Sequence, residues 1–141
     1  MRSILVLNSK GGSGKTTIAT NLASFYASIG KQVALVDLDS QESSISWLKA
    51  RSSAKPPITG IKGYGVKVKR GVDYKIIDAP AGLQGAALTK VLNMAESVII
   101  PVLPSPIDMR AAGEFIKNIK KHSRVLKEKA KIYLGAKKGR D

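Results

Sequence analysis

The chain has 141 residues and an apolar content of 43%, which together indicate one globular domain with a core rather than a disordered segment. It contains no cysteine, so disulfide bonds, thiolate metal sites and cysteine nucleophiles are excluded. The net charge of +14 predicts attraction to polyanions, of which nucleic acid is the most frequent.

The apolar runs are too short for a membrane protein. None approaches the roughly 20 residues that span a bilayer. Residues 1–9 are too short for a signal peptide and lack a cleavage pattern. We therefore expect a cytoplasmic protein.

The first predicted element is a buried parallel strand over residues 3–8, where the apolar run is continuous rather than alternating. A glycine-rich loop follows, and apolar residues then recur at helical spacing up to Gly30, a natural stop for a helix. The loop has the sequence Lys10-Gly11-Gly12-Ser13-Gly14-Lys15-Thr16-Thr17.

This loop is close to the phosphate-binding pattern of Gly, four free positions and Gly-Lys-Ser/Thr. It is shifted by one glycine, so that Gly11 or Gly12 makes the turn. Glycines let backbone N–H groups converge on phosphate oxygens, and the following helix adds its positive end. We expect Lys15 to reach the β- and γ-phosphates and the Thr16 hydroxyl to bind Mg²⁺. A glycine-rich turn alone would not explain Lys-Thr-Thr at a strand-to-helix junction. The expected nucleotide-binding residues are Gly11, Gly12, Ser13, Gly14, Lys15, Thr16 and Thr17.

Lys10 is not required by the general loop. With it, the segment resembles the deviant Walker A motif of the ParA/MinD family of ATPases. The resemblance implies ATP as the ligand and a homodimer in which Lys10 contacts the nucleotide held by the partner subunit. A positive charge there would stabilise the transferring phosphoryl group, as an arginine finger does. The alternative is an ordinary exposed loop lysine.

A second buried strand is predicted over residues 32–38, and two carboxylates, Asp37 and Asp39, lie at its end. Strand ends of this kind form the ligand crevice of open α/β sheets. The stretch resembles the Asp-x-Asp-Pro-Gln segment of the same family, with Ser40 in place of proline. The resemblance implies that Asp39 orients the attacking water and that Asp37 lies near the metal. Alternatively, both carboxylates serve the start of a helix at Ser43 or Ser44.

Residues 49–75, here called the basic segment, contain eight basic residues and one acid. Proline and glycine are frequent in it, which indicates an exposed, loop-rich connection after a short helix around residues 45–48. Residues 66–68 alternate weakly and are a possible short strand.

A strong strand signal returns at residues 74–78, a β-rich apolar run that ends in Asp78. Such a strand is typical of Walker B, whose carboxylate holds the Mg²⁺ shell. The residues that follow resemble the family's γ-phosphate-sensing switch. A helix over residues 83–95 and a fourth buried strand over residues 97–103 come next. Pro101 argues against a central strand, but the family has a similar proline-containing stretch.

The last predicted helix covers residues 107–129. Its apolar face contains Ala112, Phe115, Ile116, Ile119 and Leu126. A basic stripe opposite contains Lys117, Lys120, Lys121, Arg124 and Lys127, and it would extend to Lys131 if the helical phase runs that far. His122 has no second ligand candidate beside it, which favours a packed or edge histidine. Residues 131–135 are a possible fifth strand.

The resemblance extends from Met1 to about Ile119 and implies a three-layer α/β P-loop NTPase fold, with a mostly parallel sheet flanked by helices. We expect one domain over residues 1–141, without the C-terminal part of full-length family members. The implied function is an ATPase for plasmid or chromosome partition or cargo positioning. Its implied ligands and partners are ATP, Mg²⁺, a second copy of the chain, non-specific DNA and a small DNA-binding or adaptor protein that stimulates hydrolysis.

Two alternatives remain open. One is a truncated nucleotide- and DNA-binding module that hydrolyses nothing. The other is a MinD-like positioning ATPase on a membrane. That alternative needs a C-terminal amphipathic helix, and residues 131–141 are too short and too polar to form one.

Overall fold

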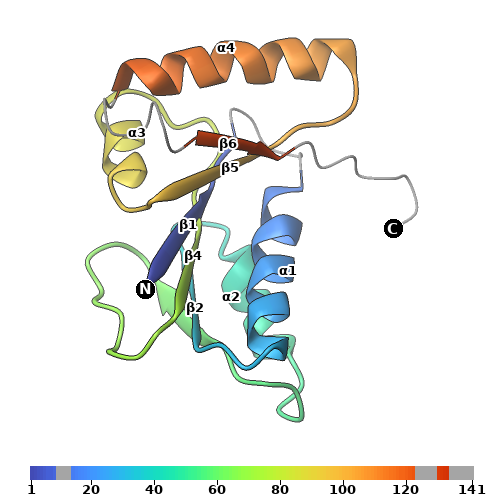
Figure 1. Ribbon diagram of the computed structural model, residues 1–141, viewed down its shortest axis with the longest axis vertical. Coiled ribbons are helices and arrows are strands. Elements are labelled where there is room, and N and C mark those ends of the chain that lie inside the picture. Colours follow the sequence, from blue (N-terminus) through green and yellow to red (C-terminus); the bar gives the residue numbers. More distant parts are fainter. Residues whose placement is uncertain (9–13, 123–129, 134–141) are drawn as a thin grey trace.

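The computed structural model describes residues 1–8, 14–122 and 130–133, in which strands and helices alternate along the chain (Figure 1). In chain order the elements are β1 (Arg2–Val6), α1 (Lys15–Ser28), β2 (Val33–Asp37), α2 (Ser43–Ala50), β3 (Thr59–Lys62), β4 (Tyr74–Asp78), α3 (Gly85–Leu92), β5 (Ser97–Pro101), α4 (Pro106–His122) and β6 (Ala130–Tyr133).

The strands form one six-stranded sheet in the order β3-β2-β4-β1-β5-β6, and every described pair is parallel. Parallel neighbours need crossover connections, which the helices supply. β1 lies between β4 and β5, with Leu5 opposite Ile77 and Val6 opposite Asp78. The prediction that the first strand and the strand ending in Asp78 lie side by side is therefore confirmed.

Helices cover both faces of the sheet (Figure 1). On one face, α1 presents the small residues Ala19, Ala23 and Ala27 to Val6 and Leu35, with α2 beside it. On the other face, α3 and α4 pack on the alternate strand residues through the side chains Leu88, Val91, Leu92, Phe115, Ile116 and Ile119. The predicted α/β fold with a sheet between two helical layers is thus confirmed. The predicted apolar face of the last helix is confirmed for Ala112, Phe115, Ile116 and Ile119, whereas Leu126 lies outside the described residues.

The prediction for the basic segment is wrong in one respect. Residues 66–68 form no strand, whereas Thr59–Lys62 pairs with β2. Only Ile61 of β3 is buried, so an apolar pattern was not visible in the sequence. Val68 packs against the core cluster from a loop.

Two helices differ from their predicted limits. α3 is shorter than the expected range 83–95, since it begins at Gly85 and ends at Leu92. α4 begins at Pro106, and its predicted end in the range 123–129 lies outside the described residues. The possible fifth strand is present as β6, one residue earlier than expected.

Pro101 is tolerated in the sheet because it is the last residue of β5. The carbonyl of Ile99 accepts from the N–H of Leu7, so the polar backbone groups of residues 99 and 101 are directed toward β1. Pro101 lacks the N–H that would continue the ladder toward β1, and the pairing of β1 with β5 ends at Val6 and Ile99.

Within the described part of the chain, no helix combines the length and apolar character needed to cross a membrane.

Candidate functional site

The site lies at the carboxyl ends of β2 and β4, where α1 begins. Gly14 precedes α1 with φ 84°, a left-handed conformation that favours glycine. Among the residues that the structure describes, no side chain caps the start of α1, and its first turn contains no acid. The helix end therefore offers free N–H groups and a positive dipole to an anion. Lys10, Gly11, Gly12 and Ser13 lie outside the described residues.

Asp78 is the centre of the site. Its side chain is fully buried at the end of β4. Lys15 pairs with its Oδ1, and the hydroxyl of Thr16 donates to its Oδ2 over 3.1 Å. The first turn of α1 and the end of β4 are thus joined by contacts of one carboxylate, and Lys15, Thr16 and Asp78 lie together as expected. Thr17 follows in the same turn, with an exposed side chain.

Asp39 reaches the same centre from the end of β2. Its Oδ2 lies 3.7 Å from Nζ of Lys15, and its side chain is 24% exposed. Its Oδ1 accepts the backbone N–H of Gln41 over 2.9 Å. The ammonium of Lys15 therefore lies between two carboxylates, one buried and one accessible to solvent.

Both carboxylate oxygens of Asp37 accept hydrogen bonds from the backbone. Its Oδ1 accepts the N–H of Asp39 and its Oδ2 the N–H of Ile45, each over 3.0 Å. Burial raises the pKa of Asp37 above its ordinary value, although these two N–H groups act in the opposite direction; the nearby Asp78 and Asp39 raise it further. Because Ile45 lies in the first turn of α2, the helix-start interpretation holds for Asp37.

Ser44 belongs to the site but was not singled out by the sequence. Its hydroxyl donates to Oδ2 of Asp78 over 2.5 Å, and the residue is fully buried. A serine at a helix start is usually read as a cap. Here the N-cap residue is Glu42, with φ 56°, and Ser44, two residues later, donates to Asp78 of β4 instead. In the sequence, the only indication of this role was the pair of serines, Ser43 and Ser44, that follows Asp39.

The oxygen donors of Thr16 and Asp78 fit Mg²⁺, a hard cation that commonly binds one or two carboxylates together with waters and substrate phosphates. Among the described residues there is no group of three or more His, Cys, Asp or Glu that could hold a metal by itself. A metal held by Thr16 and Asp78 would take waters or substrate phosphates as its further ligands.

The sequence of the chain is similar to that of known proteins. Residues 4–137 match the family described as the CobQ/CobB/MinD/ParA nucleotide binding domain. The chain is 35% identical over 121 residues to the maintenance of carboxysome distribution protein A of Gloeobacter kilaueensis. The matched region is 82% of this chain and 55% of that protein. The chain is also 40% identical over 80 residues to the chromosome-partitioning ATPase Soj of Thermus thermophilus, which covers 57% of this chain and 26% of Soj.

Among solved structures, a plasmid partition protein from Borrelia burgdorferi bound to AMPPNP has the same fold, with a TM-score of 0.72 and 19% identity. That match covers 94% of this chain and 72% of the other. The chain spans only about half the length of the carboxysome distribution protein that it resembles.

Proposed function

The chain belongs to the CobQ/CobB/MinD/ParA family of nucleotide-binding domains, and on that basis we propose that it binds and hydrolyses ATP in a cytoplasmic cycle that positions DNA or another cargo. The observation that most supports this proposal is the meeting of Lys15, Thr16 and Asp78 at the start of α1. Two relatives, a carboxysome distribution protein and a chromosome-partitioning ATPase, support the same class of activity.

In this proposal the side chain of Lys15 leaves Asp78 when a triphosphate binds. The ammonium, buried beside two carboxylates, turns to the β- and γ-phosphates, while the N–H groups of the first turn of α1 contact phosphate oxygens. Thr16 and Asp78 would hold Mg²⁺, which would neutralise charge on the phosphates. Ser44 keeps the carboxylate of Asp78 oriented through its hydrogen bond. Asp37, predicted to lie near the metal, lies opposite Asp78 in the sheet and holds the turn between β2 and α2 through its two backbone hydrogen bonds.

Hydrolysis needs a group that orients water toward the γ-phosphate. Asp39 suits this role because its carboxylate is partly exposed and lies 3.7 Å from the ammonium of Lys15. It would accept a hydrogen bond from the attacking water. Lys10 would complete the site from a second copy of the chain, so that turnover depends on an ATP-bound dimer.

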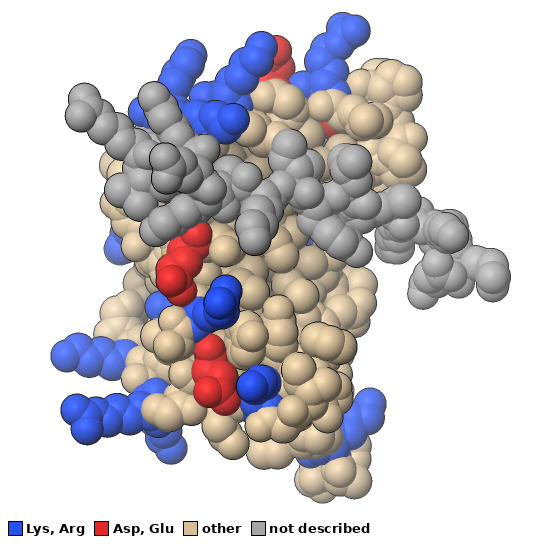
Figure 2. Space-filling model, viewed as in Figure 1, with Lys and Arg blue, Asp and Glu red and all other residues tan. Residues whose placement is uncertain are grey.

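The dimer would bind duplex DNA through basic surface, and a small adaptor protein would stimulate hydrolysis and release. Figure 2 shows Lys and Arg side chains projecting from α4 and from the opposite end of the molecule, with few acids between them. Lys117, Lys120 and Lys121 are all exposed on α4. The pair between Lys117 and Glu114, at 3.9 Å on the surface, neutralises little of this charge.

The test is Mg²⁺-dependent ATP turnover, with and without DNA. We expect turnover by the wild type and none by Lys15→Ala. The rival function is a nucleotide- and DNA-binding module without hydrolysis. ATP binding without turnover, at concentrations where a dimer forms, would establish that rival.

A further inference from the structure

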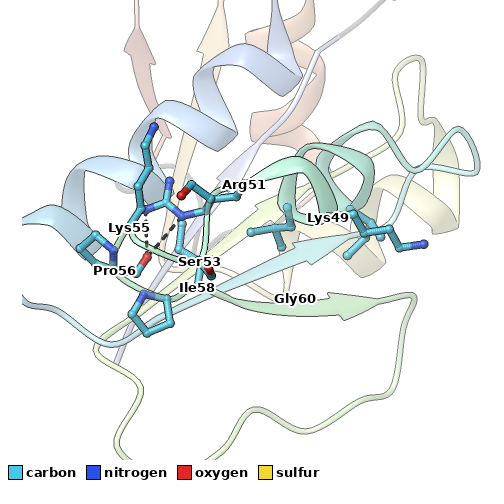
Figure 3. A pocket seen from close by; sticks show the side chains of 11 residues that line it. Lys49, Arg51, Ser53, Lys55, Pro56, Ile58 and Gly60 are labelled. Atoms are coloured by element: carbon cyan, nitrogen blue, oxygen red, sulfur yellow. Dashed lines mark hydrogen bonds between the residues drawn. The ribbon is translucent and has the colours of Figure 1, made fainter.

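A second hollow lies away from the phosphate site, between the end of α2 and the loop that leads to β3 (Figure 3). Its volume is about 560 Å³. α2 therefore contributes to two places: its first turn contacts Asp78, and its last turn lines this hollow.

The floor of the hollow is apolar. Ile45 and Leu48 of α2 and Ile58 of the loop line it and are only half-buried. β3 passes close to this floor at Gly60, where a Cβ would come within 2.9 Å of Cδ1 of Leu48. The glycine thus lets the strand approach α2, and the apolar side chains beside it remain open to solvent.

The rim of the hollow is basic. Lys49, Arg51 and Lys55 line it, and no Asp or Glu is among the lining residues. Figure 3 shows Arg51 and Lys55 on one side of the hollow and Lys49 on the other. A ligand that spans the rim would therefore meet positive charge at both ends.

Arg51 is held in place before any ligand arrives. Its Nε and Nη2 donate to the carbonyl of Pro56 over 3.3 and 2.9 Å, its Nη1 donates to the hydroxyl of Ser24 over 3.4 Å, and its guanidinium lies 5.4 Å from the ring centre of Trp47. A guanidinium has five N–H groups. Two of them remain after these three bonds, in a fixed plane, which is the geometry that suits a carboxylate.

β3 supplies the third feature, because it is an edge strand. It pairs with β2 on one side, and the sheet order leaves its other side without a strand among the described residues. Thr59, Gly60 and Lys62 are exposed along it. An edge of this kind offers backbone N–H and C=O groups to an extended peptide.

We propose that the hollow and the adjoining edge of β3 bind an extended acidic peptide of another protein, with an apolar side chain on the floor and carboxylates at Lys49, Arg51 and Lys55. The charge of the rim selects an acidic partner. A second copy of this chain is a poor occupant because it has 24 basic residues against 10 acids. Duplex DNA could pair with the basic rim, but its phosphate backbone has no apolar group to fill the floor of the hollow.

The experiment measures fluorescence anisotropy of a labelled peptide, Asp-Glu-Leu-Asp-Glu-Val-Asp-Glu, on the full chain without nucleotide. We expect binding that weakens by about fivefold or more in the double variant Lys49→Ala, Lys55→Ala. The matched control is Lys67→Ala, Lys69→Ala, which removes the same charge from exposed positions outside the hollow. This control should leave the affinity nearly unchanged. A second peptide with serine in place of leucine and valine should bind several-fold more weakly.

Four results would each overturn the proposal. The first is no binding of the acidic peptide at low salt. The second is an equal loss of affinity in both double variants, which would mean that only the net charge matters. The third is equal binding of the serine peptide. The fourth is a loss of duplex DNA affinity in Lys49→Ala, Lys55→Ala as large as the loss for peptide. That last result would assign the hollow to DNA.

Discussion

At the residue scale, the site depends on a single buried carboxylate. Asp78 has no exposed surface, so its charge is tolerated only because Lys15, Thr16 and Ser44 all contact it. Nucleotide binding would remove the lysine from this set and bring a metal ion in its place. The carboxylate would then exchange one positive partner for another without becoming unpaired.

Lys15 and Asp39 should differ in the step that their loss affects. Lys15→Ala should abolish ATP binding, because Lys15 neutralises phosphate charge in the ground state. Asp39→Ala should keep binding and slow turnover by roughly 10²-fold or more, since a water-orienting group acts chiefly in the transition state. The measurements are the Kd for ATP and the single-turnover rate. Lys31→Ala, at an exposed position, is the control. Equal loss of binding in both variants would contradict the role of Asp39.

The raised pKa of Asp37 predicts a pH dependence of stability. The folded state holds this proton more tightly than the unfolded state, so the contribution of Asp37 to the free energy of unfolding falls as pH rises from its unfolded pKa, near 3.8, through its folded pKa. The slope cannot exceed about 1.4 kcal/mol per pH unit. Denaturant unfolding of wild type and Asp37→Asn at a series of pH values isolates the effect. The quantity compared is the unfolding free energy of the wild type minus that of Asp37→Asn. If it stays constant or rises with pH, burial is not the dominant influence on the pKa of Asp37.

At the scale of elements, α2 connects the ends of β2 and β4. The N–H of Ile45 donates to Asp37 of β2, and the hydroxyl of Ser44 donates to Asp78 of β4. The start of the helix is thus held by two strand-end carboxylates rather than by its own cap, which has no side-chain hydrogen bond. Displacement of α2 would disturb both carboxylates together.

Ser44→Ala tests this connection. A buried hydrogen bond to a charged group contributes about 1.5–3 kcal/mol, so the variant should lose about that much unfolding free energy. Ser43→Ala, one residue earlier and exposed, should change it by less than about 0.5 kcal/mol. Chemical denaturation of both variants gives the comparison. A loss of the same size in Ser43→Ala would mean that a general effect at the start of α2, and not the contact with Asp78, was measured, because the higher helix propensity of alanine would act in the opposite direction.

How far the sequence predicted the molecule depends on how many residues of each element are buried. β2 is buried at every position, so its continuous apolar run was recognisable, whereas β3 has one buried residue and was missed. The meeting of Lys15 and Thr16 with Asp78 was predicted from spacing and from the resemblance. The position of Ser44 did not, because its side chain is placed by the left-handed turn at Glu42, and nothing in the local pattern requires that turn.

At the scale of the whole molecule, the question is which basic surface faces DNA. Opposite an apolar face, lysines are common on any solvated helix. The exposed lysines 117, 120 and 121 differ from an ordinary surface in having little acidic charge near them, since Glu128 is the only acid between residues 117 and 131. The basic segment has a similar excess and is the competing surface.

The salt dependence of binding to random duplex DNA distinguishes the two surfaces. Contacts to phosphates release counterions, and each adds about −0.9 to the slope of log K against log salt. If α4 faces DNA, Lys117→Ala, Lys120→Ala, Lys121→Ala should make the slope shallower by up to about 2.7, that is, about 0.9 for each lysine removed. A second triple variant, Lys67→Ala, Lys69→Ala, Arg70→Ala, removes the same charge from the basic segment and should keep the wild-type slope. The opposite pattern would assign DNA to the basic segment, and no binding by the wild type with ATP at low salt would defeat DNA binding by this chain.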